Sequence, residues 1–300
     1  MRFWRRGLVL GGAVLGAAAL AACGSSSSSS NVTPTGTTPV VKADPSVQKL
    51  VPAAIKSKGT LVVASDASYA PNEFVGPDGH TVIGMDPDLV TALGAVMGLK
   101  VKVINVSFDS IIPGMAAGKY DLGASSFTDT KERQKTVDFV TYLSVGEAFL
   151  TNASGGPSPK TLADLCGLKV AVEKGTTEQD DATKQNAKCK SGGKPAISLL
   201  VFPDQNGANL ALKSNRAQVD FADSPIIAYQ VRKLGVDVKS SPTFGTAPYG
   251  LALPKNNGMA KPVLAALNVL MKNGTYAAIL KKWQLQSAAI KKPAINGATS

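Results

Sequence analysis

The sequence predicts an α/β protein built from two lobes. Strand-like apolar runs alternate with helix-like segments, and this order is typical of parallel sheets flanked by helices. The alternation stops at a loop rich in glycine and proline, residues 153–159, and then resumes, which indicates a second unit from about Asn152. The chain from Lys58 onward is long enough for two such units. A ligand site is expected in the crevice where the carboxyl ends of the strands meet.

The first unit shows clear helix starts and stops. A helix begins at about Asp86, its apolar residues recur every three or four positions, and Gly98 ends it. The next helix stops at Gly118, and another is expected to begin at about Thr130, with Arg133 in its first turn. In chain order the expected elements are a strand at 61–64, a helix at 86–97, a strand at 101–104, a helix at 109–117 and a strand at 120–124.

The second unit repeats this order, and the last helices return to the first lobe. Strands are expected at 168–173, 197–202, 219–222 and 249–253, and helices from 177 onward and at 206–214, 226–234, 260–272 and 275–283. The expected organisation is a signal peptide at 1–22, a lipidated and disordered tether at 23–57, a first lobe at 58–151 plus 247–286, a second lobe at 152–246 and a tail at 287–300.

The first residues have the composition of a secretory signal. Residues 1–6 contain three arginines, residues 7–22 are uncharged and mostly apolar, and Cys23 follows Leu20-Ala21-Ala22. The apolar stretch is shorter than the roughly 20 residues that span a bilayer. The junction resembles the bacterial lipobox, in which the cysteine is lipidated and becomes the first mature residue. The alternative is a soluble secreted protein with an incidental cysteine, and the export route, general or twin-arginine, stays open.

The residues after Cys23 have the composition of a flexible linker. Residues 24–31 are nearly all serine, and residues 32–41 are rich in Thr, Pro and Gly and carry no charge. Such a stretch cannot bury enough apolar area to fold. It is expected to hold the folded part away from a membrane surface.

Charge and cysteine content exclude other classes of protein. The formal net charge is +11, and removing three arginines with the signal leaves +8. The lysines lie singly or in pairs and form no basic helix, so no nucleic-acid partner is expected. Cys166 and Cys189 remain for the exported protein and are expected to form a disulfide. The single histidine, His80, lies in a Gly-rich turn, so no metal or other cofactor is expected.

A run of hydroxyl side chains precedes Arg133. Ser125, Ser126 and Thr128 follow the strand expected at 120–124. The guanidinium group presents a planar pair of donors that matches a carboxylate, and hydroxyl groups or backbone amides can complete the cradle. The same residue types also form ordinary helix caps. The run alone therefore leaves a binding site and a cap open.

Several different short motifs occur along the folded part of the chain. They are S-D-A-S-Y-A-P at 65–71, G-M-D-P-D-L at 84–89, S-F-D-S-I-I-P at 107–113, G-K-Y-D at 118–121, S-S-F-T-D-T-K-E-R at 125–133, G-T-T at 175–177, A-D-S-P at 222–225 and N-G-T-Y at 273–276. In order and spacing, residues 61–283 resemble the polar amino-acid solute-binding proteins of ABC importers, family 3 of the bacterial extracellular solute-binding proteins. Asn72 replaces a frequent aromatic residue of that family, and Gln218 and Asn273 replace frequent aspartates.

The resemblance implies a fold, a location and partners. The fold is the two-lobe, type II periplasmic-binding-protein-like fold, with each lobe a sheet flanked by helices and the ligand in the cleft between them. The protein is expected to be a monomeric binding protein and not an enzyme. It would be anchored outside the cytoplasm by its lipid, and would deliver a free L-amino acid to the permease subunits of an ABC transporter.

The resemblance also implies how the backbone ends of an amino acid are held. Buried charged groups need charged, hydrogen-bonded partners. Arg133 is expected to bind the carboxylate, assisted by the hydroxyls of residues 125–128 and by the amides of the helix that Thr176 and Thr177 open. Asp223 is expected to bind the ammonium group, with a helix N-cap as the plainer alternative.

Four further side chains are expected to face the side chain of the ligand. Tyr69 and Phe108 would enclose it, unless they are ordinary core aromatics. Asp66 and Glu173 would favour a cationic side chain such as that of arginine, lysine or ornithine. The alternatives are that Glu173 pairs with Lys174 or points to solvent, and that the ligand is glutamine or another polar amino acid.

Two other functions remain as alternatives. Some proteins that resemble this family are periplasmic dehydratases, in which Glu173 or Asp66 would act as a general acid. A sensor module of a receptor is the other alternative, although no signalling domain follows Trp283 in the sequence.

Overall fold

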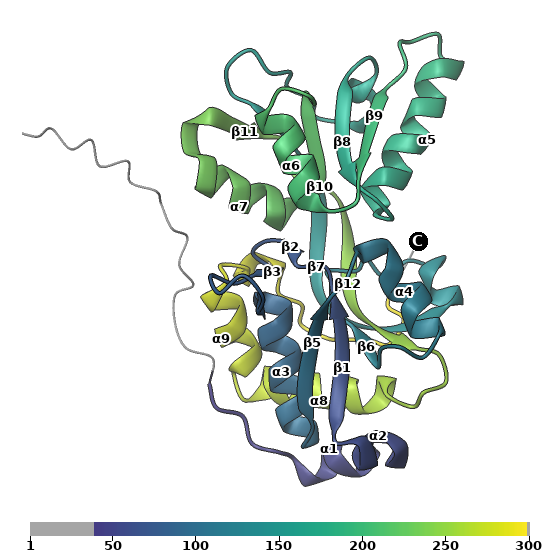
Figure 1. The fold of residues 1–300 in the computed structure, drawn as a ribbon, viewed down its shortest axis with the longest axis vertical. Coiled ribbons are helices and arrows are strands. Elements are labelled where there is room, and N and C mark those ends of the chain that lie inside the picture. Colours follow the sequence, from purple (N-terminus) through teal and green to yellow (C-terminus); the bar gives the residue numbers. More distant parts are fainter. Residues whose placement is uncertain (1–38, 299–300) are drawn as a thin grey trace, which may run out of the picture. The chain divides into compact units, whose positions relative to one another are not determined.

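The structure is a computed structural model that describes residues 39–298, and it has a two-lobe α/β fold (Figure 1). The predicted signal peptide, Cys23 and the first part of the tether, up to residue 38, lie outside the described residues. One sheet of nine strands runs through both lobes in the order β5-β1-β6-β12-β7-β10-β8-β9, with β11 (Val238–Ser240) paired to β7. A second sheet, of three strands, contains β2 (Ser68–Tyr69), β3 (Glu73–Val75) and β4 (Val82–Ile83).

Each lobe has a parallel core of three strands. In the first lobe these are β1 (Thr60–Ser65), β5 (Lys100–Asn105) and β6 (Leu122–Gly123). In the second lobe they are β8 (Lys169–Glu173), β9 (Ser198–Phe202) and β10 (Val219–Asp223). The βαβ order predicted from the sequence is therefore confirmed in both lobes.

Two long antiparallel strands, β7 (Val137–Asn152) and β12 (Phe244–Pro254), connect the lobes (Figure 1). Sequence reading missed β7 and placed only residues 249–253 of β12. The cause is that β7 is buried on both faces along most of its length, so it lacks the alternation of apolar and polar residues that marks a half-exposed strand. The pairing of β7 and β12 shifts register twice, at Phe244/Ala247 and at Tyr249/Gly250.

The helices of the first lobe cover its sheet. α3 (Met85–Met97) buries the predicted apolar stripe, including Leu89 and Leu93, and contacts α8 (Ala260–Lys272). α4 (Phe108–Ala116) and α9 (Thr275–Lys282) complete the set. Gly84 precedes α3 with a φ of 140°, and a Cβ atom there would lie 2.1 Å from the carbonyl oxygen of Asn72. The entry to α3 therefore requires glycine.

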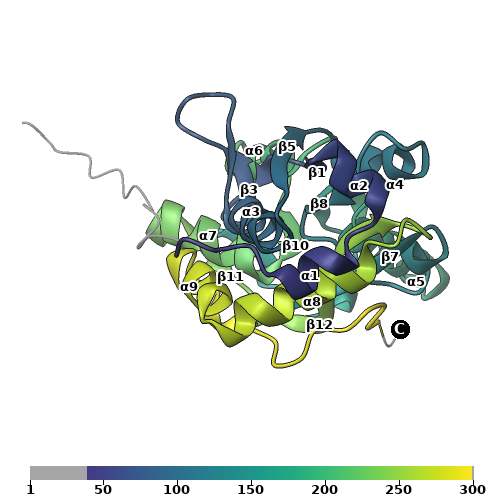
Figure 2. The same cartoon turned by 90° about the horizontal axis from the view of Figure 1, so that it is seen from below.

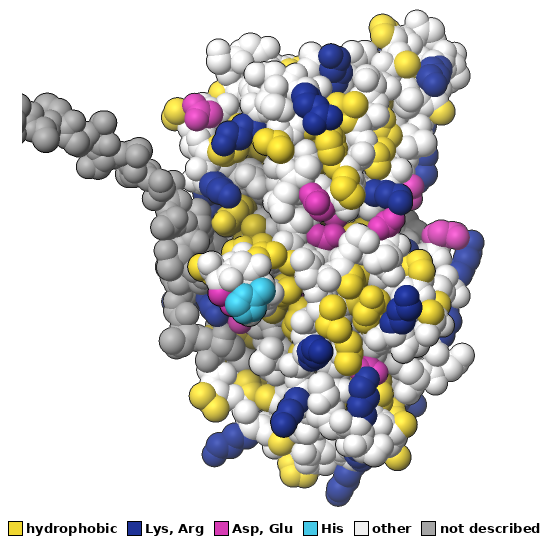
Figure 3. Space-filling model, in the orientation of Figure 1, with side chains coloured by type: hydrophobic (Ala, Val, Ile, Leu, Met, Phe, Trp, Pro, Cys, Tyr) yellow, Lys and Arg dark blue, Asp and Glu magenta, His cyan; other side chains and the backbone are white. Residues whose placement is uncertain are grey.

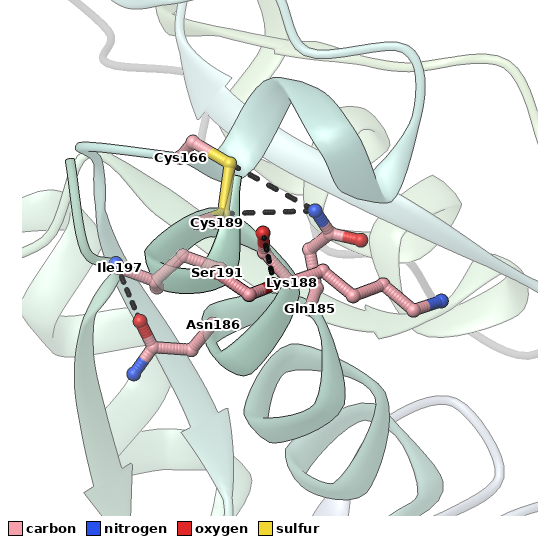
Figure 4. The surroundings of a disulfide bond; sticks show 7 residues. All are labelled: Cys166, Gln185, Asn186, Lys188, Cys189, Ser191 and Ile197. Atoms are coloured by element: carbon pink, nitrogen blue, oxygen red, sulfur yellow. Dashed lines mark hydrogen bonds between the residues drawn. A yellow bond between two sulfur atoms is a disulfide. The ribbon is translucent and has the colours of Figure 1, made fainter. Parts of the chain in front are cut away.

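The helices of the second lobe are α5 (Thr177–Ser191), α6 (Gln205–Lys213) and α7 (Ser224–Leu234). The predicted disulfide is present: Cys166 and Cys189 join the loop after a short 3-10 helix, Leu162–Leu165, to α5 (Figure 4). The side-chain amide of Gln185 lies 3.8 and 3.6 Å from the two sulfur atoms. The bridge fixes the C-terminal half of α5 against the lobe.

Part of the predicted tether is wrong. Residues 45–58 contain two short helices, α1 (Pro45–Leu50) and α2 (Ala53–Lys58). The carboxylate of Asp44 accepts a hydrogen bond from the amide of Ser46 at 2.8 Å, and Val47 is buried. Figure 2 shows α1 lying against α8. A helix cap and one buried face are enough to order these residues.

One other expectation is corrected, and the tail is bonded to the first lobe. No helix begins at Thr130: residues 133–135 form one 3-10 turn, because the segment before it is bonded to β12 and β7 starts at Val137. The predicted tail is ordered as far as residue 298. Its Asn296 accepts a hydrogen bond from the amide of Phe139 at 2.8 Å, and the amide of Ala298 donates to Asp129 at 3.1 Å.

Among residues 39–298, no single helix has the length and apolar character needed to cross a membrane. The consecutive helices α8 and α9 meet those two criteria only when taken together, and they are bent by 79° relative to each other.

Candidate ligand-binding site

A narrow cavity lies between the two lobes, and in this structure its walls leave only about 10 Å³ of free space, about the room that one water molecule needs. It is lined by every ligand-binding residue that the sequence predicted, together with two acidic residues that it did not. The lining residues are Asp66, Tyr69, Glu73, Phe108, Ser125, Ser126, Thr128, Arg133, Glu173, Thr176, Thr177, Glu178 and Asp223. The structure therefore brings the predicted set together, whereas the role of each residue stays a prediction.

The ends of parallel strands deliver most of these side chains. Asp66 follows β1, Ser125 follows β6, and Glu173 ends β8. The backbone amide of Asp66 donates to the hydroxyl of Ser125 at 2.8 Å, and the carboxylate of Asp66 accepts from the amide of Phe108 at 3.0 Å. Carboxyl ends of parallel strands meet at one edge of a sheet, which explains this convergence.

Arg133 is fixed in position by both lobes. Its guanidinium group donates to the carbonyl of Thr128 at 2.9 Å in the first lobe and to the carbonyl of Gly175 at 3.0 Å in the second. The group also lies 5.5 Å from the ring centroid of Phe108 and 5.6 Å from that of Phe127. Only two of its five N–H donors are used in these bonds, so three N–H donors remain to bind a carboxylate.

The N-terminus of α5 begins two residues after Gly175, whose carbonyl accepts from Arg133. Thr176 is the N-cap residue, and its hydroxyl accepts from the amide of Gln179 at 3.2 Å. The hydroxyls of Thr177 and Thr128 lie 3.3 Å apart and connect the lobes. Free amides at a helix start favour an anion, so this end of the cavity suits a carboxylate.

Asp223 also lines the cavity and contacts Tyr69 of the first lobe. The Tyr69 hydroxyl donates to the Asp223 carboxylate at 2.9 Å and accepts from the Asp223 amide at 3.1 Å. Asp223 does occupy the N-cap position of α7, as the alternative expected, but its carboxylate makes no capping hydrogen bond there. Burial raises the pKa of Asp223 to about 6, opposed by the hydroxyls of Tyr249 and Tyr69 and by the charge of Arg133.

Glu173 faces the cavity and not the solvent. Its side chain is 2% exposed, and Lys174 pairs instead with Asp109 at 2.7 Å. Both plainer alternatives for Glu173 are therefore wrong. Burial, followed by the charge of Asp66, raises the pKa of Glu173 well above its usual range.

Phe108 and Tyr69 belong both to the cavity wall and to the packed interior. Phe108 stacks on Phe127 with ring centroids 4.5 Å apart, and both aromatics are buried. The enclosure of a ligand side chain between Tyr69 and Phe108 remains a prediction.

Sequence reading missed Glu73 and Glu178. Glu73 is fully buried and accepts hydrogen bonds from the hydroxyls of Ser126 at 3.1 Å and Ser125 at 3.4 Å. The neighbouring Asn72, which replaces the family's aromatic residue, donates to Ser126 at 2.9 Å. Glu178 lies in the first turn of α5, where an acidic residue is usually solvated. No local signal separates these two glutamates from surface residues.

The cavity carries far more negative than positive groups. Five of the lining residues are carboxylic acids, and Arg133 is the one cation among them. Figure 3 shows acidic side chains gathered where the two lobes meet, whereas basic ones are scattered over both lobes. Within residues 39–298 no group of three or more His, Cys, Asp or Glu is arranged to hold a metal ion. This charge balance suits a small cation that also carries a carboxylate.

Comparisons with known proteins agree with this geometry. The sequence profile of the bacterial extracellular solute-binding proteins, family 3, matches residues 61–286. Arginine-binding protein ArgT of Corynebacterium glutamicum is 33% identical over 84% of the chain and 83% of its own length.

Two solved structures are also similar. A mutant of ArgBP from T. maritima superposes with a TM-score of 0.71 at 31% identity, over 77% of this chain and 97% of that one. The ancestral amino acid-binding protein AncCDT-1, a precursor of cyclohexadienyl dehydratase, has a TM-score of 0.69 at 33% identity, over 77% and 97%.

Proposed function

The chain belongs to the bacterial extracellular solute-binding proteins of family 3, and on this premise we propose that it captures a free L-amino acid with a cationic side chain. The observation that carries the proposal is the cavity between the lobes, whose wall carries five carboxyl groups and one guanidinium. Arginine, lysine and ornithine are the candidate ligands, and the captured amino acid is passed to the permease of an ABC transporter.

The proposed roles follow from the charges of the ligand. The carboxylate pairs with the remaining N–H donors of Arg133 and with the start of α5 near Thr177. The ammonium group pairs with Asp223. A cationic side chain then reaches Asp66 and Glu173, which are otherwise two acidic groups close enough to repel each other.

Closure of the lobes is part of the proposed mechanism. Arg133 and Asp66 come from the first lobe, whereas Thr177, Glu173 and Asp223 come from the second. A ligand that contacts both lobes stabilises the closed state more than the open one. The bulged pairing of β7 and β12 between the lobes supplies a place where the backbone can bend.

Calorimetric titration tests the ligand class. The wild-type protein is expected to bind arginine or lysine more tightly than glutamine, and Glu173→Gln is expected to reduce arginine affinity more than glutamine affinity. The reason is that only the cationic side chain loses a charged partner, a change of roughly 1.5–3 kcal/mol. Glu132→Gln is the matched control, because the Glu132 side chain is 79% exposed and pairs with Lys135. Tighter binding of glutamine than of arginine by the wild type contradicts the cationic preference.

A dehydratase-like enzyme is the second candidate, favoured by one observation: Glu173 is buried, and its raised pKa suits a general acid. The similarity to AncCDT-1 points the same way, although AncCDT-1 itself is described as an amino acid-binding protein. We favour binding because Asp223 keeps a carboxylate where an amino acid places its ammonium group. A ring acid without an ammonium group needs no such partner.

The location proposed for the protein is outside the cytoplasm, held to the membrane by a lipid on Cys23. The support is the basic start, the apolar stretch and the Leu20-Ala21-Ala22-Cys23 junction. Cys23→Ser is expected to move the protein from the membrane fraction to the soluble fraction, as measured by fractionation and immunoblotting. Cys189→Ser controls for loss of a cysteine as such, since Cys189 lies in the disulfide. If Cys23→Ser stays with the membranes as the wild type does, the lipid anchor is wrong.

A further inference from the structure

Glu178 is a buried acid in the cavity wall that the proposed roles do not use. Its side chain is 2% exposed and lines the cavity from the first turn of α5. One carboxylate oxygen, Oε2, accepts from the hydroxyl of the neighbouring Thr177 at 3.2 Å. The other oxygen, Oε1, is buried and has no partner among the described residues. A buried acceptor without a donor is costly, so this oxygen is available for a ligand or a proton.

The groups around Glu178 are mainly acidic. Asp223 from the end of β10 and Glu147 from β7 are the acids whose charges act on it most strongly, and Arg133 is the cation that acts on it. The hydroxyls of Tyr69 and Tyr249 also face this cluster and are neutral, because burial raises the pKa of both well above the usual value. Glu147 in turn faces Asp181 and Lys184 of α5.

One guanidinium cannot keep three buried carboxylates ionised. Burial raises the pKa of Glu147 to about 8 and that of Asp223 to about 6, and it raises the pKa of Glu178 well above its usual value. Asp223 is the acid held most strongly in its charged form, by Tyr69 and Arg133. Glu178 is stabilised in its charged form only by its own backbone amide, Thr177 and the charge of Arg133, and no tyrosine hydroxyl donates to it, so it is the member of the pair that takes up a proton.

We infer that Glu178 is a second acceptor for the ammonium group of the ligand, and that it carries a proton in the empty cavity which the ammonium group displaces. The inference rests on the proposed function, because it requires an amino acid in this cavity. The O–H bond of the Glu178 carboxyl group breaks, the proton passes to the solvent, and the resulting carboxylate accepts an N–H of the ammonium group beside Asp223. Each amino acid captured then releases one proton at this end of the cavity.

The direction of the pH dependence follows from this exchange. The pKa of Glu178 is raised in the empty protein, and the ammonium group lowers it in the complex. Between these two values, affinity rises up to about tenfold per pH unit for one proton released. Above the pKa of the empty protein, the dependence disappears.

Calorimetry in two buffers of different ionisation enthalpy counts the protons. At about pH 7, the wild type is expected to release up to about one proton more than Glu178→Gln does when each binds L-arginine. L-citrulline, the uncharged analogue of arginine, is expected to release the same proton, because its ammonium group is unchanged. Glu132→Gln, the exposed control, is expected to release as many protons as the wild type.

The outcomes separate this inference from the proposed function. Binding of L-arginine with equal heats in both buffers, or with a proton count that Glu178→Gln leaves unchanged, overturns the role of Glu178. If arginine releases a proton and bound citrulline does not, the proton comes from the end of the cavity that holds the ligand side chain. This outcome also overturns the role of Glu178. If Glu178→Gln fails to fold, as thermal unfolding would show, the wild-type proton counts for the two ligands decide. Absence of binding for every common amino acid contradicts the proposed function instead.

Discussion

Replacing Arg133 with alanine is expected to weaken the binding of every amino acid by roughly a hundredfold or more. The guanidinium is the one cation in the cavity wall, and it lies where the carboxylate common to all amino acids is proposed to bind. Removing one member of a buried charged pair costs about 3–5 kcal/mol, which corresponds to at least that loss of affinity. The substitution also removes the bond from Arg133 to the Gly175 carbonyl, which connects the lobes.

Two further variants show whether the shape or only the charge of Arg133 matters. Arg133→Lys keeps the charge but loses the planar fork, so calorimetry is expected to place its affinity between those of the wild type and Arg133→Ala. Arg216→Ala is the matched control: Arg216 is exposed and its guanidinium lies over an aromatic ring, Phe202, 5.7 Å from the centroid. Unchanged affinity in Arg133→Ala would remove the basis for the whole assignment of the site.

Much of the site was predictable from the order of secondary structure. Parallel strands present their carboxyl ends at one edge, so Asp66 is expected near Ser125 in the first lobe, and Glu173 near Asp223 in the second. The expectation that the two pairs face one ligand came from the family resemblance. Asp223 shows the limit of this reasoning. Its sequence context fits a helix cap equally well, and only the contact with Tyr69 of the other lobe distinguishes the two roles.

The features that sequence reading missed depend on contacts between segments that are far apart in the chain. β7 is buried on both faces, so its strand character has no periodic pattern. Glu73 and Glu178 resemble surface acids until the fold places them in the wall of the cavity. Gln218, which replaces a frequent aspartate of the family, bonds within the second lobe: its side-chain carbonyl accepts from the amide of Lys169 at 3.0 Å.

The strands β7 and β12, which run between the lobes, make the two halves of the site interdependent. Glu147 and Asp223 are paired residues of β7 and β10, so the acidic cluster of the second lobe is attached directly to a strand that continues into the first. The proposed change in protonation at the ammonium end therefore occurs beside the segment that bends on closure. Capture of the ligand, closure and loss of a proton are expected to occur together for this reason.

Asp223→Asn is the second substitution with a large expected effect. The amide keeps the shape of the side chain and can still contact the Tyr69 hydroxyl, but it removes the charge that faces the ligand ammonium group. A hydrogen bond to a charged partner contributes roughly 1.5–3 kcal/mol, so calorimetry should show affinity falling about 10- to 150-fold for arginine, lysine and glutamine alike. Asp237→Asn, an exposed change in the same lobe, should leave affinity unchanged.

Combining Asp223→Asn with Glu178→Gln tests whether the two acids serve one ammonium group. If each carboxylate can partly replace the other, the double variant loses more affinity than the sum of the two single losses, because no acceptor with a charge remains. Additive losses would show that the two acids act separately, and the second ammonium acceptor would then be wrong. Unchanged affinity in Asp223→Asn alone would move the ammonium group elsewhere in the cavity, toward Asp66 or Glu73, which are its other acids in the first lobe.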